Sequence, residues 1–319
     1  MSFALFSSDL SLLVYASGCV ADLFVRIPDA LHPVAWYGRA AASVVRIAPT
    51  VGSARAFAAG VFIALGLPAA AVGIVHGALV LTQPWPVVSV LLQVLILYSC
   101  VCLFGLLEAA RTLVRTLREQ GLEAARPRLR WLCSRDPAEL DANGLANGTV
   151  ESLAENLSDS VVAPLFFLVC FGVEGAVAYR AINTLDAMIG YRGKYEWLGK
   201  PAARLDDLAN VVPARLTTLL LAAAGLSLRG VSLARGFAVW SRDHARTASP
   251  NAGHPMAMAA GLLGVKLDKP GHYALGDGLP AATPEDIPRA ISLGRRAGLL
   301  ALSFAAVAVY WFGLDGVYG

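Results

Sequence analysis

The stretch VESLAENLSDSVVAPLFF, residues 150–167, joins an acidic helical pattern directly to an apolar run. Glu151, Glu155 and Asp159 are four residues apart, so on a helix they fall on nearly one face. Like charges at this spacing repel one another by about a few tenths of a kcal/mol per pair in water, and by more where water is excluded. The apolar residues that follow would exclude water, so the acids need a neutralising partner.

Two kinds of partner remain open from the sequence alone. A divalent cation such as Mg²⁺ takes carboxylate oxygens together with substrate phosphates. The alternative is a solvated helix face, or ion pairs with arginines such as Arg135 or Arg204. Because acids beside or within a membrane segment are functional by default, the pattern favours the cation.

The composition places the chain in a membrane. Of its 319 residues, 56% are hydrophobic and only 15% charged, with a mean hydropathy of +0.59. These values predict an all-α integral membrane protein, a polytopic helical bundle. The net charge is only +3 and the basic residues are scattered, which excludes a nucleic-acid binder. No internal repeat is present, so one polytopic domain over residues 1–319 is the simplest organisation.

About twenty apolar residues are needed to cross a bilayer. Residues 56–81, 85–107 and 297–314 meet that length, and residues 10–25 are a weaker candidate. Residues 161–179 and 208–228 contain glutamate, proline or arginine, so we expect broken or re-entrant helices there. Basic segments stay in the cytoplasm, which predicts amphipathic helices on that side and an active site facing the cytoplasm, in the inner membrane.

A second cluster lies in YRAINTLDAMIGYRGKYEWLGKPAARLDDLANVVPAR, residues 179–215. It interleaves acids and amides with arginine and lysine, a composition that suits a polyphosphate and its Mg²⁺. An ordinary juxtamembrane loop, with basic residues meeting anionic lipid, is the alternative. The Walker pattern is absent, so any nucleotide binds by another fold.

A third constellation is SPNAGHPMAMAAGLLGVKL, residues 249–267, where Ser249 and Asn251 break the chain before a small-residue helix. Such a break can present helix N-terminal amides to an anion, although a turn of this composition is also common between helices without any function. His254 is a candidate proton shuttle, but a loop histidine is more often neither acid nor ligand.

The order of HPVAWYGR, ESLAEN, APLFF, NTLD, RLDD and SPN, between residues 22 and 267, resembles the adenosylcobinamide-phosphate synthase (CobD/CbiB) family of cobalamin biosynthesis. The resemblance implies an integral-membrane ligase. Such a ligase joins the free carboxylate of adenosylcobyric acid, as an amide, to aminopropanol phosphate or its ethanolamine counterpart. The reaction uses ATP as co-substrate and Mg²⁺ and passes through an acyl phosphate, and the corrinoid is a substrate and not a prosthetic group.

Carried over residue by residue, the resemblance implies three sets. The catalytic set is Glu151, Glu155, Asp159, Asp186, Asp206 and Asp207, of which Glu151, Glu155, Asp206 and Asp207 would hold the metal. Substrate and phosphate binding would fall to Asn156, Arg180, Asn183, Arg192, Lys194, Arg204, Asn210, Arg215, Ser249 and Asn251. The chain departs from the family in VRIPDALHPV, in AENLSDS and at His254, which puts fine positioning and the accepted amine in question.

Other function classes remain open. A Mg²⁺-dependent intramembrane prenyltransferase or phosphotransferase also uses acidic helices, but on long unbroken spans. A non-catalytic regulatory protein resembling AmpE shares the fold type, although the retained NTLD, RLDD and SPN elements argue against it. A transporter would show paired inverted halves, which are missing. The lipid bilayer is the expected surrounding, and the sequence leaves open both a homo-oligomer and complexes with other membrane enzymes of the pathway.

Overall fold

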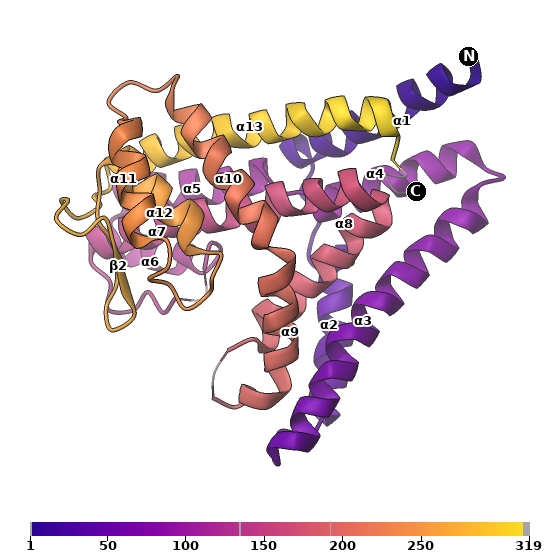
Figure 1. Ribbon diagram of the computed structural model, residues 1–319, viewed down its shortest axis with the longest axis horizontal. Coiled ribbons are helices and arrows are strands. Elements are labelled where there is room, and N and C mark those ends of the chain that lie inside the picture. The colour runs from indigo at the N-terminus through magenta and orange to yellow at the C-terminus, as the bar shows by residue number, and fades with distance from the viewer. Residues whose placement is uncertain (1, 134, 192, 315–319) are drawn as a thin grey trace. The chain divides into compact units, whose positions relative to one another are not determined.

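A computed structural model describes residues 2–133, 135–191 and 193–314 (Figure 1). The chain divides into two compact units, each built from segments that are far apart in the sequence. Unit 1 combines described residues of 1–102, 163–209 and 302–319, and unit 2 combines those of 103–162 and 210–301. Most described residues are helical, which confirms the all-α fold class.

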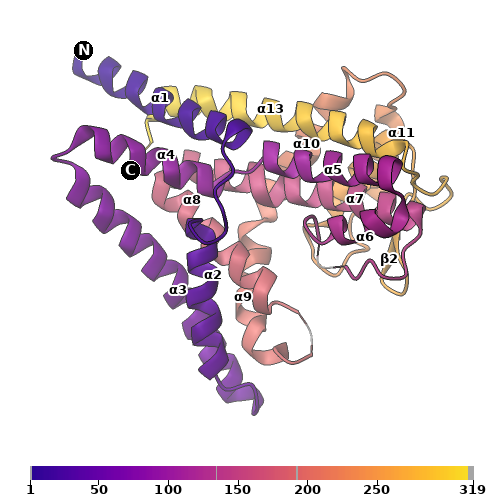
Figure 2. The same cartoon turned by 180° about the vertical axis from the view of Figure 1, so that it is seen from behind.

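Unit 1 contains six whole helices: α1 (Ser2–Phe24), α2 (Pro33–Ile47), α3 (Ser53–Thr82), α4 (Pro86–Cys100), α8 (Ala163–Ile189) and α9 (Glu196–Ala209). α3 packs against α8 and α9, and Figure 2 shows α2, α3 and α9 running together. Gly60 of α3 lies against the backbone carbonyl of Leu198, so close that a Cβ would clash. Ile63, Leu185 and Ile189 belong to the buried core between these helices.

Unit 2 contains α5 (Phe104–Gln120), α6 (Leu122–Leu129), α7 (Ala142–Leu157), the π-helix η1 (Ser158–Val162), α10 (Val211–Gly225), α11 (Leu233–Asp243) and α12 (Gly253–Leu263). A short antiparallel pair, β1 (Leu267–Lys269) and β2 (Tyr273–Leu275), follows α12. α13 (Asp286–Phe312) has residues in both units. Every residue of α12 is buried, because its glycines and alanines let α11 approach closely, as at Gly261 against the Arg235 carbonyl.

Three described helical segments are long and apolar enough to cross a membrane: 53–82, 142–189 and 286–312. This number rises to as many as five if α4 with α5 and α9 with α10 each form one broken span. The predicted span 85–107 is therefore interrupted, since α4 ends at Cys100 and α5 begins at Phe104. Residues 208–228 cover the end of α9 and all of α10, and residues 161–179 lie in the long segment, which is non-helical at Phe171 and Gly172.

α7 begins earlier than the two Asn-Gly pairs in its sequence suggest. Asp141 caps the helix, accepting a hydrogen bond from the Gly144 amide at 2.7 Å. Gly148 lies against the Leu129 side chain, where a larger residue would be crowded. The acidic residues that follow thus start two turns inside an established helix.

Candidate functional site

The first cluster of predicted site residues lies in unit 1, where α8 meets α9. The Asn183 amide donates to Asp206 Oδ1 at 3.2 Å. The two helices come this close because Gly199 of α9 lies against the Ile189 carbonyl at the end of α8, leaving no room for a Cβ. The NTLD and RLDD elements, 23 residues apart in sequence, therefore meet side chain to side chain.

The other predicted residues of this region lie on α8, on α9 or between these two helices. Arg204 Nη1 lies 3.4 Å from Asp207 Oδ2, one helical turn away, and Arg204 itself is exposed. Asp186 is one turn after Asn183 on α8, and its carbonyl accepts from the Gly190 amide where the helix ends. The Lys194 ammonium lies 5.2 Å from the centre of the Tyr195 ring. Arg192 lies outside the described residues.

The second cluster is in unit 2, on α7. Arg135 Nη2 lies 2.9 Å from Glu151 Oε2, and both side chains are nearly buried. Asn156 donates to the backbone carbonyls of Leu132, at 3.1 Å, and Ser152, at 3.0 Å. The arginine-bearing loop before α7 is thus tied to the acidic face, and Glu151 has the ion-pair partner that was the alternative to a cation.

Two further acids and one amide lie near Glu151 on α7 and η1. Glu155 is half-buried one turn after Glu151, and Asp159 lies in η1, where the wider π turn re-aims the side chains that follow. Asn147, one turn before Glu151, accepts from the Asp268 amide at 3.0 Å and so holds strand β1 against α7.

The third cluster is also in unit 2 and contains the Ser-Pro-Asn turn. Arg215 Nη1 of α10 donates to Asn251 Oδ1 at 3.3 Å and to the Val211 carbonyl at 2.7 Å. Ser249 Oγ accepts from the Asn251 amide at 3.2 Å, which shapes the turn. Asn251 is buried, whereas Arg215 is exposed. Asn210, buried as well, immediately precedes α10.

His254 is more deeply built into this cluster than its loop position indicated. Trp240 Nε1 donates to His254 Nδ1 at 3.0 Å, and the His244 ring lies 4.5 Å away, centre to centre. Burial, together with the positive charge of Arg215 and the neighbouring His244, lowers the pKa of His254 to about 4. The ring is therefore neutral near pH 7, and its Nδ1 accepts a hydrogen bond, so Nε2 carries the proton.

Asp243 is an anchor that the sequence analysis missed. The side chain is fully buried and accepts hydrogen bonds from Arg242, at 2.8 Å to each oxygen, and from the Gly276 amide at 2.7 Å. Burial opposes its ionisation, but these hydrogen bonds outweigh burial and lower the pKa. The only sequence signal was an acid between two arginines at the end of α11, which is common on surfaces.

The predicted site residues are thus divided between the two units. Unit 1 holds Arg180, Asn183, Asp186, Lys194, Arg204, Asp206 and Asp207, and unit 2 holds Glu151, Glu155, Asn156, Asp159, Asn210, Arg215, Ser249 and Asn251. Across the described ranges, no group of three or more His, Cys, Asp and Glu side chains could hold a metal ion by itself. The four predicted metal ligands remain a prediction.

Fold and clusters together define an all-α polytopic membrane protein whose paired acids, amides and arginines come from broken helices. A family model described as "CobD/Cbib protein" matches residues 15–294. The chain belongs to this family of cobalamin biosynthesis.

Several relatives carry the name "Cobalamin biosynthesis protein CobD". The protein from Dehalococcoides mccartyi is 38% identical over 94% of this chain and 98% of its own length. The Rhodobacter capsulatus protein is 38% identical, with the same coverage of both chains. The Mycobacterium tuberculosis protein is 39% identical over 92% of this chain and 94% of its own. No solved structure matches the chain.

Proposed function

We propose that the protein is an adenosylcobinamide-phosphate synthase, which joins the free carboxylate of adenosylcobyric acid to the amine of aminopropanol phosphate or ethanolamine phosphate. The observation that carries the proposal is the contact of Asn183 with Asp206, beside the Arg204–Asp207 pair. It brings carboxylate, amide and guanidinium groups together in a chain of the cobalamin biosynthesis family.

The reaction has two steps. The corrinoid carboxylate attacks the γ-phosphorus of ATP, forming an acyl phosphate and releasing ADP. The free amine of the second substrate then attacks the acyl carbon, and inorganic phosphate leaves with the bonding electron pair. The nitrogen loses one proton to the phosphate or to water, which leaves the amide. Both steps bring anions together, so the protein must hold and neutralise phosphates while it orients the reacting atoms.

The basic side chains supply that neutralisation. Arg204 and Arg215 are exposed and present guanidinium groups suited to bidentate contact with phosphate oxygens, and Lys194 adds a point charge. Arg192 belongs to the same proposed set from its sequence position. Asn251, ordered by Arg215 and Ser249, would orient a polar group of the substrate. Arg180, predicted for the same set, lies in the wall of an apolar cavity of unit 1.

A Mg²⁺ ion fits the predicted site residues only if it binds together with ATP. The described residues form no self-sufficient metal group, whereas Mg²⁺ commonly takes one or two carboxylates and completes its shell with substrate phosphates and water. Asp206 and Asp207 offer the hard oxygen ligands for such an ion. When bound with ATP, the ion would neutralise charge on the transferring phosphoryl group.

His254 can contribute a neutral hydrogen-bond donor to the site. Its neutral ring keeps a proton on Nε2 that can be donated to a substrate oxygen, and Trp240 fixes the orientation of the ring. An imidazole that stays neutral near pH 7 adds no positive charge beside Arg215. We place it as a substrate-binding residue of the Ser-Pro-Asn cluster, acting through the hydrogen bond from Nε2. The long apolar helices are those of a membrane protein. We propose that it lies in the inner membrane with its active site facing the cytoplasm.

The test is turnover by the detergent-purified protein with adenosylcobyric acid, aminopropanol phosphate, ATP and Mg²⁺, followed by mass spectrometry of the corrinoid. The expected product is heavier by one amide-linked aminopropanol phosphate and forms only when ATP and Mg²⁺ are both present. Corrinoid binding without any product would overturn the ligase proposal and point to a carrier or regulatory protein. Parallel assays with ethanolamine phosphate identify the accepted amine.

A further inference from the structure

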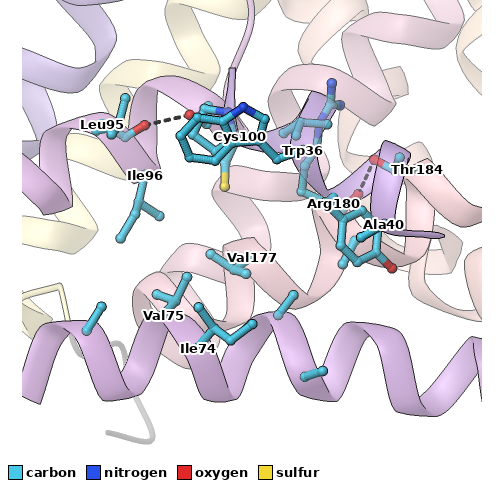
Figure 3. A pocket seen from close by; sticks show the side chains of 18 of the residues that line it. Trp36, Ala40, Ile74, Val75, Leu95, Ile96, Cys100, Val177, Arg180 and Thr184 are labelled. Atoms are coloured by element: carbon cyan, nitrogen blue, oxygen red, sulfur yellow. Dashed lines mark hydrogen bonds between the residues drawn. The ribbon is translucent and has the colours of Figure 1, made fainter. Parts of the chain in front are cut away.

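Unit 1 contains a cavity of about 480 Å³ between α2, α3, α4 and α8. Figure 3 shows α3, with Ile74 and Val75, along one side of it and Trp36, Cys100 and Arg180 on the opposite side. Nearly all of its wall is apolar, because α3 contributes alanines, leucine, isoleucine and valine, and α4 contributes leucines and isoleucine. A cavity of this size is within the range of ligand sites in proteins.

Two polar groups in this apolar wall have unused hydrogen-bonding capacity. The Tyr37 hydroxyl and the Arg180 Nε are buried atoms without a hydrogen-bond partner in the described part of the chain. The guanidinium of Arg180 makes no ion pair or hydrogen bond to a described residue, although it is half-buried. Burial and the charge of Arg180 lower the pKa of nearby His32. An uncompensated guanidinium beside an apolar cavity calls for an anion.

The cavity opens through an apolar surface. Ile74 lines it and yet is 73% exposed, and Trp36 is 51% exposed. Ile74 lies on α3, which is long and apolar enough to span a bilayer. Tryptophan is also enriched where a membrane meets water. A ligand can therefore enter sideways from the lipid.

We propose that this cavity binds an anionic phospholipid, with one acyl chain in the apolar space and its phosphate on Arg180. A nucleotide or a corrinoid does not fit this wall, because their many polar groups would be buried against aliphatic side chains without partners. An acyl chain needs no such partners, and a guanidinium matches two phosphate oxygens at once. The site is independent of the ligase proposal.

Native mass spectrometry of the full-length protein in detergent tests the site, with dioleoylphosphatidylglycerol and dioleoylphosphatidylcholine as probes. The expected result is one retained phosphatidylglycerol per chain, in clear preference to phosphatidylcholine. Arg180→Gln should weaken phosphatidylglycerol binding about tenfold or more, the effect of losing a charge-assisted hydrogen bond. Ala71→Trp, which fills the cavity from α3, should abolish retention of the lipid.

Leu65→Trp is the matched control, since Leu65 is on the same helix, is 58% exposed and does not line the cavity. It should retain phosphatidylglycerol as the unmodified protein does. Val177→Phe narrows the cavity from α8. It is the second cavity-filling variant, used if thermal unfolding shows that the Ala71→Trp protein is not folded. Equal retention of both lipids with no effect of Arg180→Gln would overturn the proposal. The proposal would also be overturned if inorganic phosphate displaced phosphatidylglycerol while both cavity-filling variants still bound the lipid unchanged. That result would show a site for small anions instead.

Discussion

Arg135 and Glu151 form an ion pair in which Nη2 lies 2.9 Å from Oε2, with the side chains only 13% and 7% exposed. The pair joins the loop before α7 to the acidic face of that helix. Desolvation of two charges offsets much of their attraction, so the pair itself adds little net stability. Removing one partner is different, because it leaves the other charge buried and uncompensated.

Replacing Arg135 with alanine should therefore destabilise unit 2 strongly. The expected loss in the free energy of unfolding is about 3–5 kcal/mol, the usual cost of breaking a buried pair from one side. The measurement is unfolding of the purified protein in detergent, followed by circular dichroism. Among the described residues, Glu151 Oε1 is already buried without a hydrogen-bond partner, so a second acceptor would be left unsatisfied in the variant.

The matched control is the double variant Arg135→Leu with Glu151→Leu, which removes both charges. It should recover much of the stability lost in Arg135→Ala, because no buried charge remains. If Arg135→Ala unfolds like the unmodified protein, the Glu151 carboxyl is neutralised by something other than this arginine, which includes a proton taken up by the carboxyl itself.

The contact of α3 with α9 gives a second prediction. Gly60→Ala should lower the free energy of unfolding by about 1–3 kcal/mol, since the new Cβ would clash with the rigid Leu198 backbone. Gly66→Ala, two turns further along the same helix, meets no atom within 4 Å. It should be neutral or stabilise by up to about 1 kcal/mol, because alanine is the better helix former. Thermal unfolding of the two variants side by side decides, and equal melting temperatures would show that the helices are not packed this closely.

Much of the fold was predictable because apolar length is a strong signal in membrane helices. The predicted span at 56–81 lies within α3, and the helix break near Asn210 lies inside the segment expected to be broken. The break between α4 and α5 after Cys100 was not predicted, because the residues on both sides of it are apolar and no proline or polar turn residue marks it. The start of α7 is hard to predict for the opposite reason. Two Asn-Gly pairs, which usually mark turns, lie inside the helix, where the Asp141 cap and the packing of Gly148 override that preference.

The sequence predicts which kinds of residue form the candidate site, but not which of these residues contact one another. Asn183 and Asp206 meet because Gly199 lets α9 approach α8, a tertiary effect that no local pattern contains. His254 was given little weight because its structural partners, Trp240 and His244, belong to an element that carried no motif.

His254 leads to a prediction about pH. Above about pH 6.5 the ring is neutral in both folded and unfolded states, so it adds no pH dependence. Between that value and about pH 4 the unfolded chain binds a proton that the folded chain does not, so the free energy of unfolding should fall with decreasing pH. The loss should reach about 3 kcal/mol at most and level off below pH 4.

Unfolding of the purified protein between pH 4 and 8 tests this, with His254→Gln as the variant. Glutamine keeps an acceptor for Trp240 but does not titrate, so the slope over this window should flatten. His272 is exposed, and His272→Gln should leave the slope as it is. A His254→Gln protein with the full slope would show that other groups carry the pH dependence.

Asp206→Asn should reduce ligase turnover by at least about a hundredfold, the usual cost of losing a group that stabilises transition-state charge, while the protein stays folded. Asparagine keeps the shape and an acceptor for the Asn183 amide, so α8 and α9 should remain packed. Glu139→Gln, an exposed acid in unit 2, is the charge-matched control and should turn over normally. Turnover is measured from the corrinoid product by mass, and thermal unfolding checks the fold. Normal turnover in Asp206→Asn would remove Asp206 from the reaction and leave its contact with Asn183 as a packing feature alone.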